Sequence, residues 1–173
     1  MIRGGFLKTT ACVALFALVG LLCLTANAFA ATTDTADVGA IIIAPLTIGH
    51  TVDLDFGTLG FGVGAGTATI TPVGGRTVTG SATAVPGGQH AASFDITGEG
   101  TNGYAITLQP GHIHMGNGAT GDMTVDTFTS LPSGTGTLTA GTDTLLVGAS
   151  LHSLGTQETG TYTGTFDVTV AYN

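Results

Sequence analysis

Residues 162–172 read YTGTFDVTVAY, and their large apolar side chains recur at even-numbered positions. Consecutive residues of a β-strand point to opposite faces, so this period of two predicts a strand from Tyr162 to Tyr172 with one buried face. No long stretch after residue 30 has apolar residues at helical spacing, and its abundant glycine and threonine disfavour helix. The positions on the apolar face are Tyr162, Phe166, Val168, Val170 and Tyr172.

Eight further segments have the composition or alternation of strands and are separated by Gly, Pro, Asn and Asp. They are Val38–Ile48, Leu54–Phe56, Thr67–Pro72, Arg76–Gly80, Phe94–Ile96, Tyr104–Leu108, Met123–Phe128 and Thr144–Leu151. The connections at 73–75 and 98–103 predict hairpins, and 110–122 and 130–142 predict long loops. About nine strands at this spacing are typical of a sandwich or barrel, and we predict an all-β sandwich.

The first thirty residues have the three parts of a secretory signal peptide. Arg3 and Lys8 form a positive start, an apolar run follows, and Ala28-Phe29-Ala30 supplies the small residues that a signal peptidase reads. Cleavage after Ala30 leaves residues 31–173 as one predicted domain. A lipoprotein signal ending at Cys23 is the weaker alternative, because Leu22 stands where a small residue is required.

Removal of this signal leaves a strongly acidic chain without cysteine. Both cysteines and two of the three Lys and Arg residues lie in it, so the mature chain has Arg76 against eleven carboxylates, a net charge of −10. Nucleic acid is excluded as a partner because phosphate binding needs clustered Lys and Arg, and anionic membrane surfaces are disfavoured likewise. The exported fold cannot use disulfides, so its core must stabilise it.

Two groups of side chains invite a metal-binding interpretation. His112 and His114 could chelate a transition metal with His90 or His152, but no recognised zinc spacing accompanies them, which favours exposed loop histidines. Asp53 and Asp55 share a strand face, but no Asp-rich loop of calcium-binding spacing surrounds them. We therefore expect no metal and no cofactor.

Catalytic and nucleotide-binding interpretations are weaker still. Ser150 and His152 share a strand face without a nucleophile-elbow motif, and the glycine-rich run 60–66 is followed by neither a helix pattern nor a P-loop lysine. Arg76 is expected to fix its own hairpin through a neighbouring carboxylate. We predict no catalytic residues and a protein that is not an enzyme.

Four segments together resemble the secreted bacterial family known as domain of unknown function 4402: Val38 to Ile48, Asp53 to Leu59, Gly74-Gly75-Arg76, and Gly160 to Asn173. A looser similarity extends to spore-coat-U-like and chaperone-usher pilus subunits. It implies an immunoglobulin-like fold whose last strand ends the chain and whose subunits polymerise by donating a strand to a neighbour.

The chain departs from the pilus pattern near its start. Ala44-Pro45 stands where many pilus subunits have a disulfide, and residues 31–37 are polar and would make a poor donor strand. Donation would therefore use Val38–Ile48 itself, or the fold is self-complete and exchanges no strand.

These features predict an exported structural protein, either a subunit of a surface filament or pilus, or an adhesive surface module, that assembles by β-strand pairing. The expected partners are further copies or related surface subunits, with a periplasmic chaperone and an outer-membrane usher. Sheet edges are open to pairing because the mature chain has no lysine to guard them. The alternative is a monomeric secreted module that binds carbohydrate or another ligand through loops 110–122 and 130–142, although no Trp offers a sugar platform. The predicted assembly residues are Ile41, Ile43, Ile48, Tyr162, Phe166, Val168, Val170 and Tyr172.

Overall fold

The structure is a computed structural model that describes residues 31–118, 123–155 and 157–173. The predicted signal peptide, with its cleavage site, lies outside the described residues. The chain divides into two units, residues 1–40 and 41–173. In the first, residues 31–40 are exposed and have no regular structure.

The second unit contains every strand of the described residues and no helix. Its strands are β1 (Thr47–Val52), β2 (Leu59–Ile70), β3 (Arg76–Ala84), β4 (Ala92–Thr97), β5 (Gly103–Leu108), β6 (Ile113–Met115), β7 (Met123–Leu131), β8 (Thr135–Thr137), β9 (Thr142–Ser153) and β10 (Val168–Tyr172).

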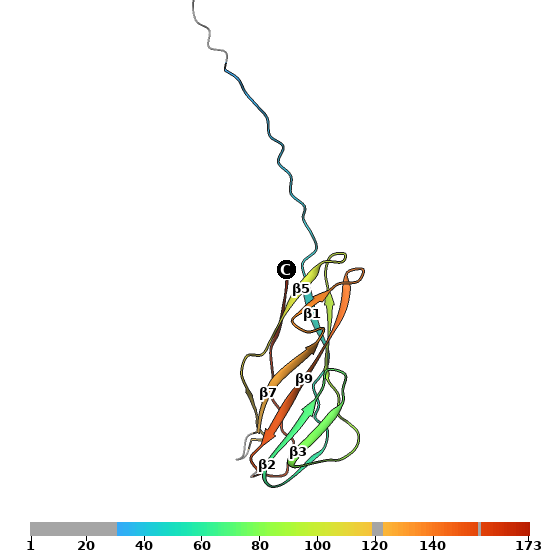
Figure 1. The fold of residues 1–173 in the computed structure, drawn as a ribbon, viewed down its shortest axis with the longest axis vertical. Helices are drawn as coiled ribbons and strands as arrows, with labels where there is room; N and C mark the ends of the chain where they lie inside the picture. The colour runs from blue at the N-terminus through green and yellow to red at the C-terminus, as the bar shows by residue number, and fades with distance from the viewer. Residues whose placement is uncertain (1–30, 119–122, 156) are drawn as a thin grey trace, which may run out of the picture. The chain divides into compact units, whose positions relative to one another are not determined.

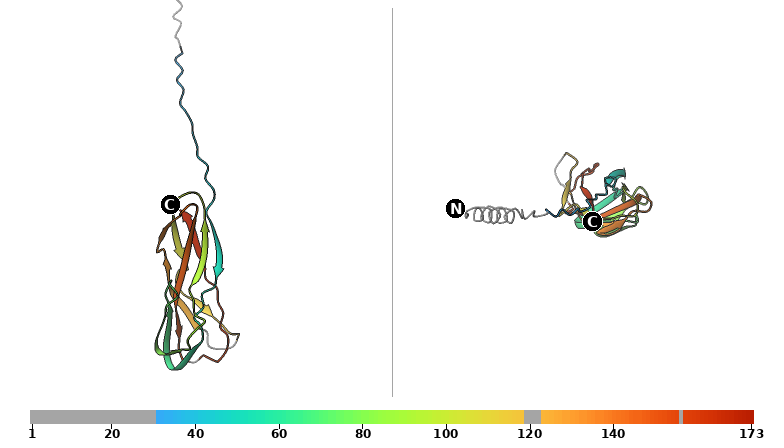
Figure 2. Two further views of the ribbon diagram at one scale, coloured as in Figure 1. Left: turned by 90° about the vertical axis from the view of Figure 1, so that its right-hand side faces the viewer. Right: turned by 90° about the horizontal axis from the view of Figure 1, so that it is seen from above.

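The strands form two antiparallel sheets. In the larger sheet the order is β1-β4-β9-β2-β3, with β7 on the other edge of β9 and β6 beyond it. The smaller sheet has the order β10-β5-β8. Figure 1 shows β9 running along the middle of the fold, and Figure 2 shows the same strands from two further sides. The predicted all-β sandwich is thus confirmed.

Alternate residues of the strands fill a core with two clusters. One lies around Phe56, Ile70 and Leu151, and the other joins the two sheets through Ile96 and Tyr104. Tyr104 is 0% exposed, and its hydroxyl donates to Asp143 Oδ2 at 2.8 Å. Half-buried apolar side chains also pack against each cluster.

The β2–β3 hairpin is irregular along its length. The register shifts between Phe61 and Gly66, opposite Gly80. Gly80 has a φ of 67°, and a Cβ built there would collide with the carbonyl oxygen of Ala65. Glycine tolerates both the positive φ and the close approach to Ala65, so this position fixes where the hairpin can bend.

The predicted first strand is wrong over most of its length. Val38–Ile48 was expected to be one strand, but β1 begins at Thr47 and residues 38–46 pair with no strand. Apolar sequence makes a strand only where an edge offers its backbone a ladder, and 38–46 has none within its own chain.

Other boundaries also differ from the prediction. Of the predicted strand Tyr162–Tyr172, only Val168–Tyr172 is a strand. Before it, Thr163 forms an isolated β-bridge to Gly116. Leu54–Phe56 is likewise no strand, although Asp55 bridges to His90.

Two connections were also mispredicted. Residues 98–103 join β4 in one sheet to β5 in the other, so they are no hairpin. The expected loop 110–122 contains β6, and 130–142 contains β8 and the end of β7. Such short strands carry too few residues to show a period.

Candidate functional site

The two sheets each have an edge strand with one side free of ladder partners in the described residues. β1 pairs with β4 and β10 pairs with β5, and neither pairs with a second strand, although β1 and β10 approach each other. Half-buried apolar side chains on and beside these strands pack against the second core cluster. We call this surface the β1/β10 edge, made of Leu46, Ile48, Phe166, Val168, Val170 and Tyr172.

Contacts fix the two strands at this edge. Phe94 of β4 meets Phe166 edge-on, with ring centroids 6.2 Å apart. The hydroxyl of Tyr172 accepts the backbone N–H of Glu99 at 2.7 Å and donates to the carbonyl of Ala44 at 3.1 Å. Asn173 N donates to Gly103 O at 3.2 Å. The last strand is therefore held at its C-terminal end, while its apolar side chains stay partly open to solvent.

The residues before β1 are apolar and exposed. Val38 is 98%, Ile41 92%, Ile42 96% and Ile43 44% exposed. Large aliphatic side chains so exposed in succession mark surfaces that a partner covers. We call Val38–Ala44 the apolar segment.

The predicted assembly residues therefore fall in three places. Ile48, Phe166, Val168, Val170 and Tyr172 come together at the β1/β10 edge, and Ile41 and Ile43 lie in the apolar segment. Tyr162 lies elsewhere: it packs against the first core cluster, and its hydroxyl donates to Glu158 O at 2.9 Å.

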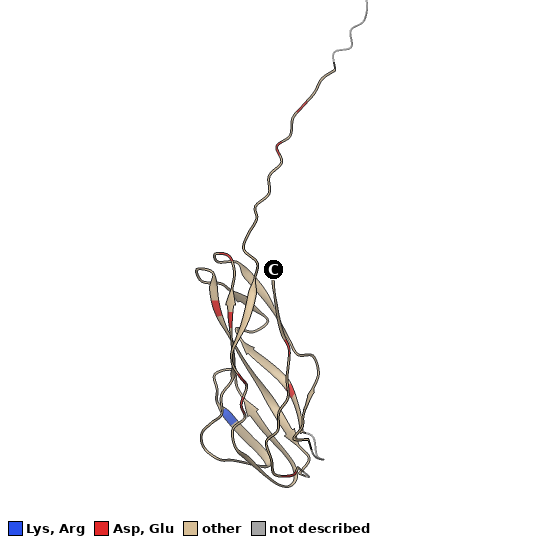
Figure 3. Cartoon of the chain, turned by 180° about the vertical axis from the view of Figure 1, so that it is seen from behind, with Lys and Arg blue, Asp and Glu red and all other residues tan. Residues whose placement is uncertain are grey.

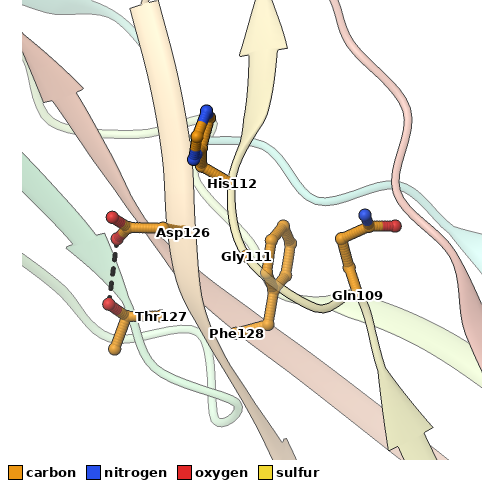
Figure 4. Close-up of a pocket in the computed structure, with 6 residues that line it drawn as sticks. All are labelled: Gln109, Gly111, His112, Asp126, Thr127 and Phe128. Carbon is orange, nitrogen blue, oxygen red and sulfur yellow. Dashed lines mark hydrogen bonds between the residues drawn. The ribbon is translucent and has the colours of Figure 1, made fainter.

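A second feature, a shallow pocket, lies where β7 is bulged. We call it the bulge pocket, and Figure 4 shows its lining side chains. The register of β7 against β9 shifts between Asp126 and Thr129, and Thr127 has a φ of 50°. A β-branched residue with positive φ is a conformational outlier, and bulges commonly re-aim side chains at functional sites. The pocket is lined by Gln109, Gly111, His112, Asp126, Thr127 and Phe128.

Asp126 is the charged centre of the bulge pocket. Its Oδ1 accepts the Thr127 hydroxyl at 2.9 Å and lies 2.8 Å from Nε2 of His152. Partial burial alone would raise the pKa of Asp126, but the hydrogen bonds from Thr127 and His152 and the nearby charge of His112 together hold it below its usual value. Asp126 is therefore ionised at neutral pH.

The sequence did not single out Asp126. Its partner His152 is on β9, and the Nδ1 of that ring contacts the Thr67 hydroxyl on β2 at 3.1 Å. Ser150, considered beside His152, bonds instead to Thr69 at 2.8 Å. Only the strand order brings these groups together.

The predicted histidine group does not converge as a metal site. The rings of His112 and His114 are 5.2 Å apart, His90 contacts the Asp53 carbonyl at 2.8 Å, and His152 is bound to Asp126. In the described part of the chain, no three His, Cys, Asp or Glu side chains are placed to hold a metal ion together.

The remaining candidate residues take part in contacts within the fold. Asp53 Oδ1 lies 3.1 Å from Nε2 of His50, and Asp55 Oδ1 accepts the N–H of Gly57 at 2.6 Å. The run 60–66 lies within β2. Arg76 does fix the chain, but through carbonyl oxygens and not the expected carboxylate: it donates to Phe56 O at 2.7 Å and Val85 O at 2.5 Å.

Fold and edges together define an all-β sandwich domain with an open strand edge. Residues 46–172 match the family model of the domain of unknown function DUF4402. The chain belongs to this family, as the resemblance in its sequence indicated. No curated protein and no solved structure matches it. Within the described residues, no helix is long and apolar enough to cross a membrane.

Proposed function

We propose that this protein is an exported, non-catalytic structural subunit that builds a surface filament or adhesive layer by adding a β-strand of one copy to the next. The observation that carries the proposal is an exposed apolar segment in a chain whose β1/β10 edge is open. Strand addition uses both features, because it supplies backbone hydrogen bonds to an edge and buries alternate side chains in it.

The apolar segment suits the donor role because it stands outside every ladder. Residues 38–46 pair with no strand of their own chain, so donating Val38–Ala44 breaks no ladder of the fold. The hydrogen bonds it would give up are those of the Ala44 backbone to the Glu99 carboxylate and the Tyr172 hydroxyl. Burying one exposed Ile or Val side chain contributes about 1.5–3 kcal/mol. Ile41 and Ile43 would face one way and Ile42 the other, as successive strand residues do.

The acceptor role falls to β10. Val168, Val170 and Tyr172 are spaced by two along the strand and are half-buried, while Thr169 and Ala171 between them are exposed. A strand laid beside β10 would complete the cover over Phe166 and the second core cluster. The same spacing on donor and acceptor is what a strand pair requires.

This proposal includes the route and the partners expected from the sequence. The subunit would be exported to the cell surface or secreted through the periplasm, where a chaperone would shield the open edge until an outer-membrane usher passes the subunit to the growing assembly. Shielding is needed because an exposed apolar edge aggregates.

The test uses two variants of residues 31–173 that fail in complementary ways. The donor variant carries Ile41→Asp, Ile42→Asp and Ile43→Asp, and the acceptor variant carries Val170→Asp. Each alone should stay monomeric in size-exclusion chromatography with light scattering, while the unaltered chain forms long assemblies in negative-stain electron microscopy. Mixed together, the two variants should give heterodimers and nothing longer, because only one donor and one acceptor remain.

Val63→Asp is the matched control, since Val63 is 101% exposed and lies in β2. It should assemble like the unaltered chain, and thermal unfolding should show that all variants are folded. A compact monomer of the unaltered chain at high concentration, or a donor variant that still forms long assemblies, would contradict the proposal.

A further inference from the structure

We propose that the bulge pocket binds a neutral polyhydroxylated ligand such as a sugar ring, with Asp126 as the principal hydrogen-bond acceptor. This inference is independent of strand exchange. It rests on one carboxylate, one aromatic ring and the backbone of β7.

The carboxylate of Asp126 is fixed in place, and only one of its two oxygens accepts hydrogen bonds in the described residues. Both of its hydrogen bonds, from Thr127 and His152, end on Oδ1, and within the described residues Oδ2 has no hydrogen-bond partner. His152 is itself held by Thr67, so a chain of contacts across three strands fixes the acceptor. A fixed carboxylate oxygen with free lone pairs can accept two hydroxyl groups of one ligand.

The aromatic side of the pocket is equally fixed. Phe128 stacks on Phe166, with ring centroids 5.1 Å apart and planes 30° apart. It borders the pocket beside Asp126, and His112 stands across from them (Figure 4). A sugar ring has an apolar C–H face and a rim of hydroxyls, so an aromatic ring next to a carboxylate and an imidazole matches both.

Gln109 completes the lining and is also held in place. Its Oε1 accepts the backbone N–H of Asp167 at 3.1 Å. A few precisely placed polar groups fix the orientation of a ligand in a small-ligand site, and Gln109 and Asp126 would do so here.

The charge of the pocket lining limits the class of ligand that can bind. The lining contains no Lys or Arg, and ionised Asp126 repels an anion. An apolar ligand would bury this carboxylate without a new partner, which is unfavourable. A metal ion is disfavoured because no group of described residues can hold one. A small organic ammonium could bind the free Oδ2, but it lacks the hydroxyl rim and C–H face that the imidazole and the Phe128 ring would contact.

The backbone supplies the third argument. Thr127 keeps a positive φ inside a bulge that breaks the β7–β9 register, although a regular strand would avoid both. The bulge sets Asp126, Thr127 and Phe128 around one hollow. Conformations of this kind are concentrated at binding sites.

The test is saturation-transfer NMR of residues 31–173 with D-glucose, D-mannose, D-galactose and N-acetylglucosamine, which works for monomers and assemblies alike. At least one sugar should show saturable transfer with a Kd in the millimolar range, strongest at C–H protons of one ring face. Asp126→Asn should weaken binding at least tenfold, because the amide supplies a donor where hydroxyl protons point.

The control is Asp95→Asn, which removes the same charge from an exposed carboxylate on β4. It should leave the Kd unchanged, and thermal unfolding should show that both variants are folded. Absence of saturable transfer for all four sugars, equal Kd values for Asp126→Asn and the unaltered chain, or tighter binding of methylammonium than of any sugar overturns the proposal.

Discussion

Asp126 shows how a single residue acquires its role from strands distant in sequence. Its hydrogen bonds come from the adjacent Thr127 and from His152, and the second exists only because β7 and β9 are neighbours. The sequence identified His112 and His152 as chemically interesting but paired neither with this carboxylate. The sequence shows which side chains the chain carries, but it does not show which residues pair across strands.

The lowered pKa of Asp126 makes a prediction about stability and pH. A carboxyl whose pKa is lower in the folded state stabilises the fold fully above its unfolded pKa, here 3.8, and this contribution is lost as pH falls through the folded value. Asp126→Asn should therefore lower the free energy of unfolding at pH 7 by about 0.2–1 kcal/mol, since the pair is partly exposed and screened.

Urea unfolding at several pH values between 7 and 2 measures this effect. The difference between Asp126→Asn and the unaltered chain should shrink once pH falls below 3.8. Asp95→Asn serves as the comparison. A difference that is the same at pH 7 and pH 2 would show that the pair contributes nothing through its charge.

The alternation of apolar and polar residues located most strands, but it predicted too long a strand at each end of the described chain. Thr67–Pro72, Arg76–Gly80 and Thr144–Leu151 lie within or largely within β2, β3 and β9, where both faces of the pattern are sorted between core and solvent. Val38–Ile48 has the same composition, but only its last two residues belong to a strand. A strand needs a partner edge as well as a pattern, and the partner is a tertiary property.

The close approach of Gly80 to Ala65 in the β2–β3 hairpin makes a prediction about stability. Gly80→Ala should lower the free energy of unfolding by about 1–3 kcal/mol or more, because alanine at positive φ is strained and its Cβ meets the Ala65 carbonyl. Gly74→Ala is the matched comparison, since Gly74 has a φ of 82° and a Cβ added there would have no neighbouring atom within 4 Å.

Gly74→Ala should therefore cost only the backbone strain, about 1 kcal/mol. Chemical denaturation monitored by circular dichroism compares the two variants. Equal losses for Gly80→Ala and Gly74→Ala would mean that the close approach to Ala65 does not constrain the bend.

For the whole molecule, charge decides how copies meet. Arg76 is the one Lys or Arg of the described residues, and carboxylates are spread over the strands and loops (Figure 3). Residues 31–173 have one Arg and eleven carboxylates, a net charge of −10, so copies of this part of the chain repel each other before an apolar strand can reach an edge. The proposed assembly therefore works against long-range repulsion.

Salt should accordingly accelerate assembly. Raising NaCl from 0.01 to 0.15 M shortens the Debye length from about 30 to about 8 Å, which screens the repulsion between subunits. The rate of assembly of residues 31–173, followed by light scattering, should rise severalfold, and the donor variant should show no such rise. A rate that falls with salt would indicate that attraction between charges, and not apolar strand addition, drives association.

The sequence by itself determined the class of fold, the acidic charge and the absence of cysteine after residue 30, because alternation and composition are local properties. It also placed Ile48 and Val168 to Tyr172 among the apolar strand residues. Only the tertiary structure decided which edges stay open, that residues 38–46 join no strand, and that Asp126 meets His152 in a bulge. These depend on strand order and register, which arise from packing between segments far apart in the chain.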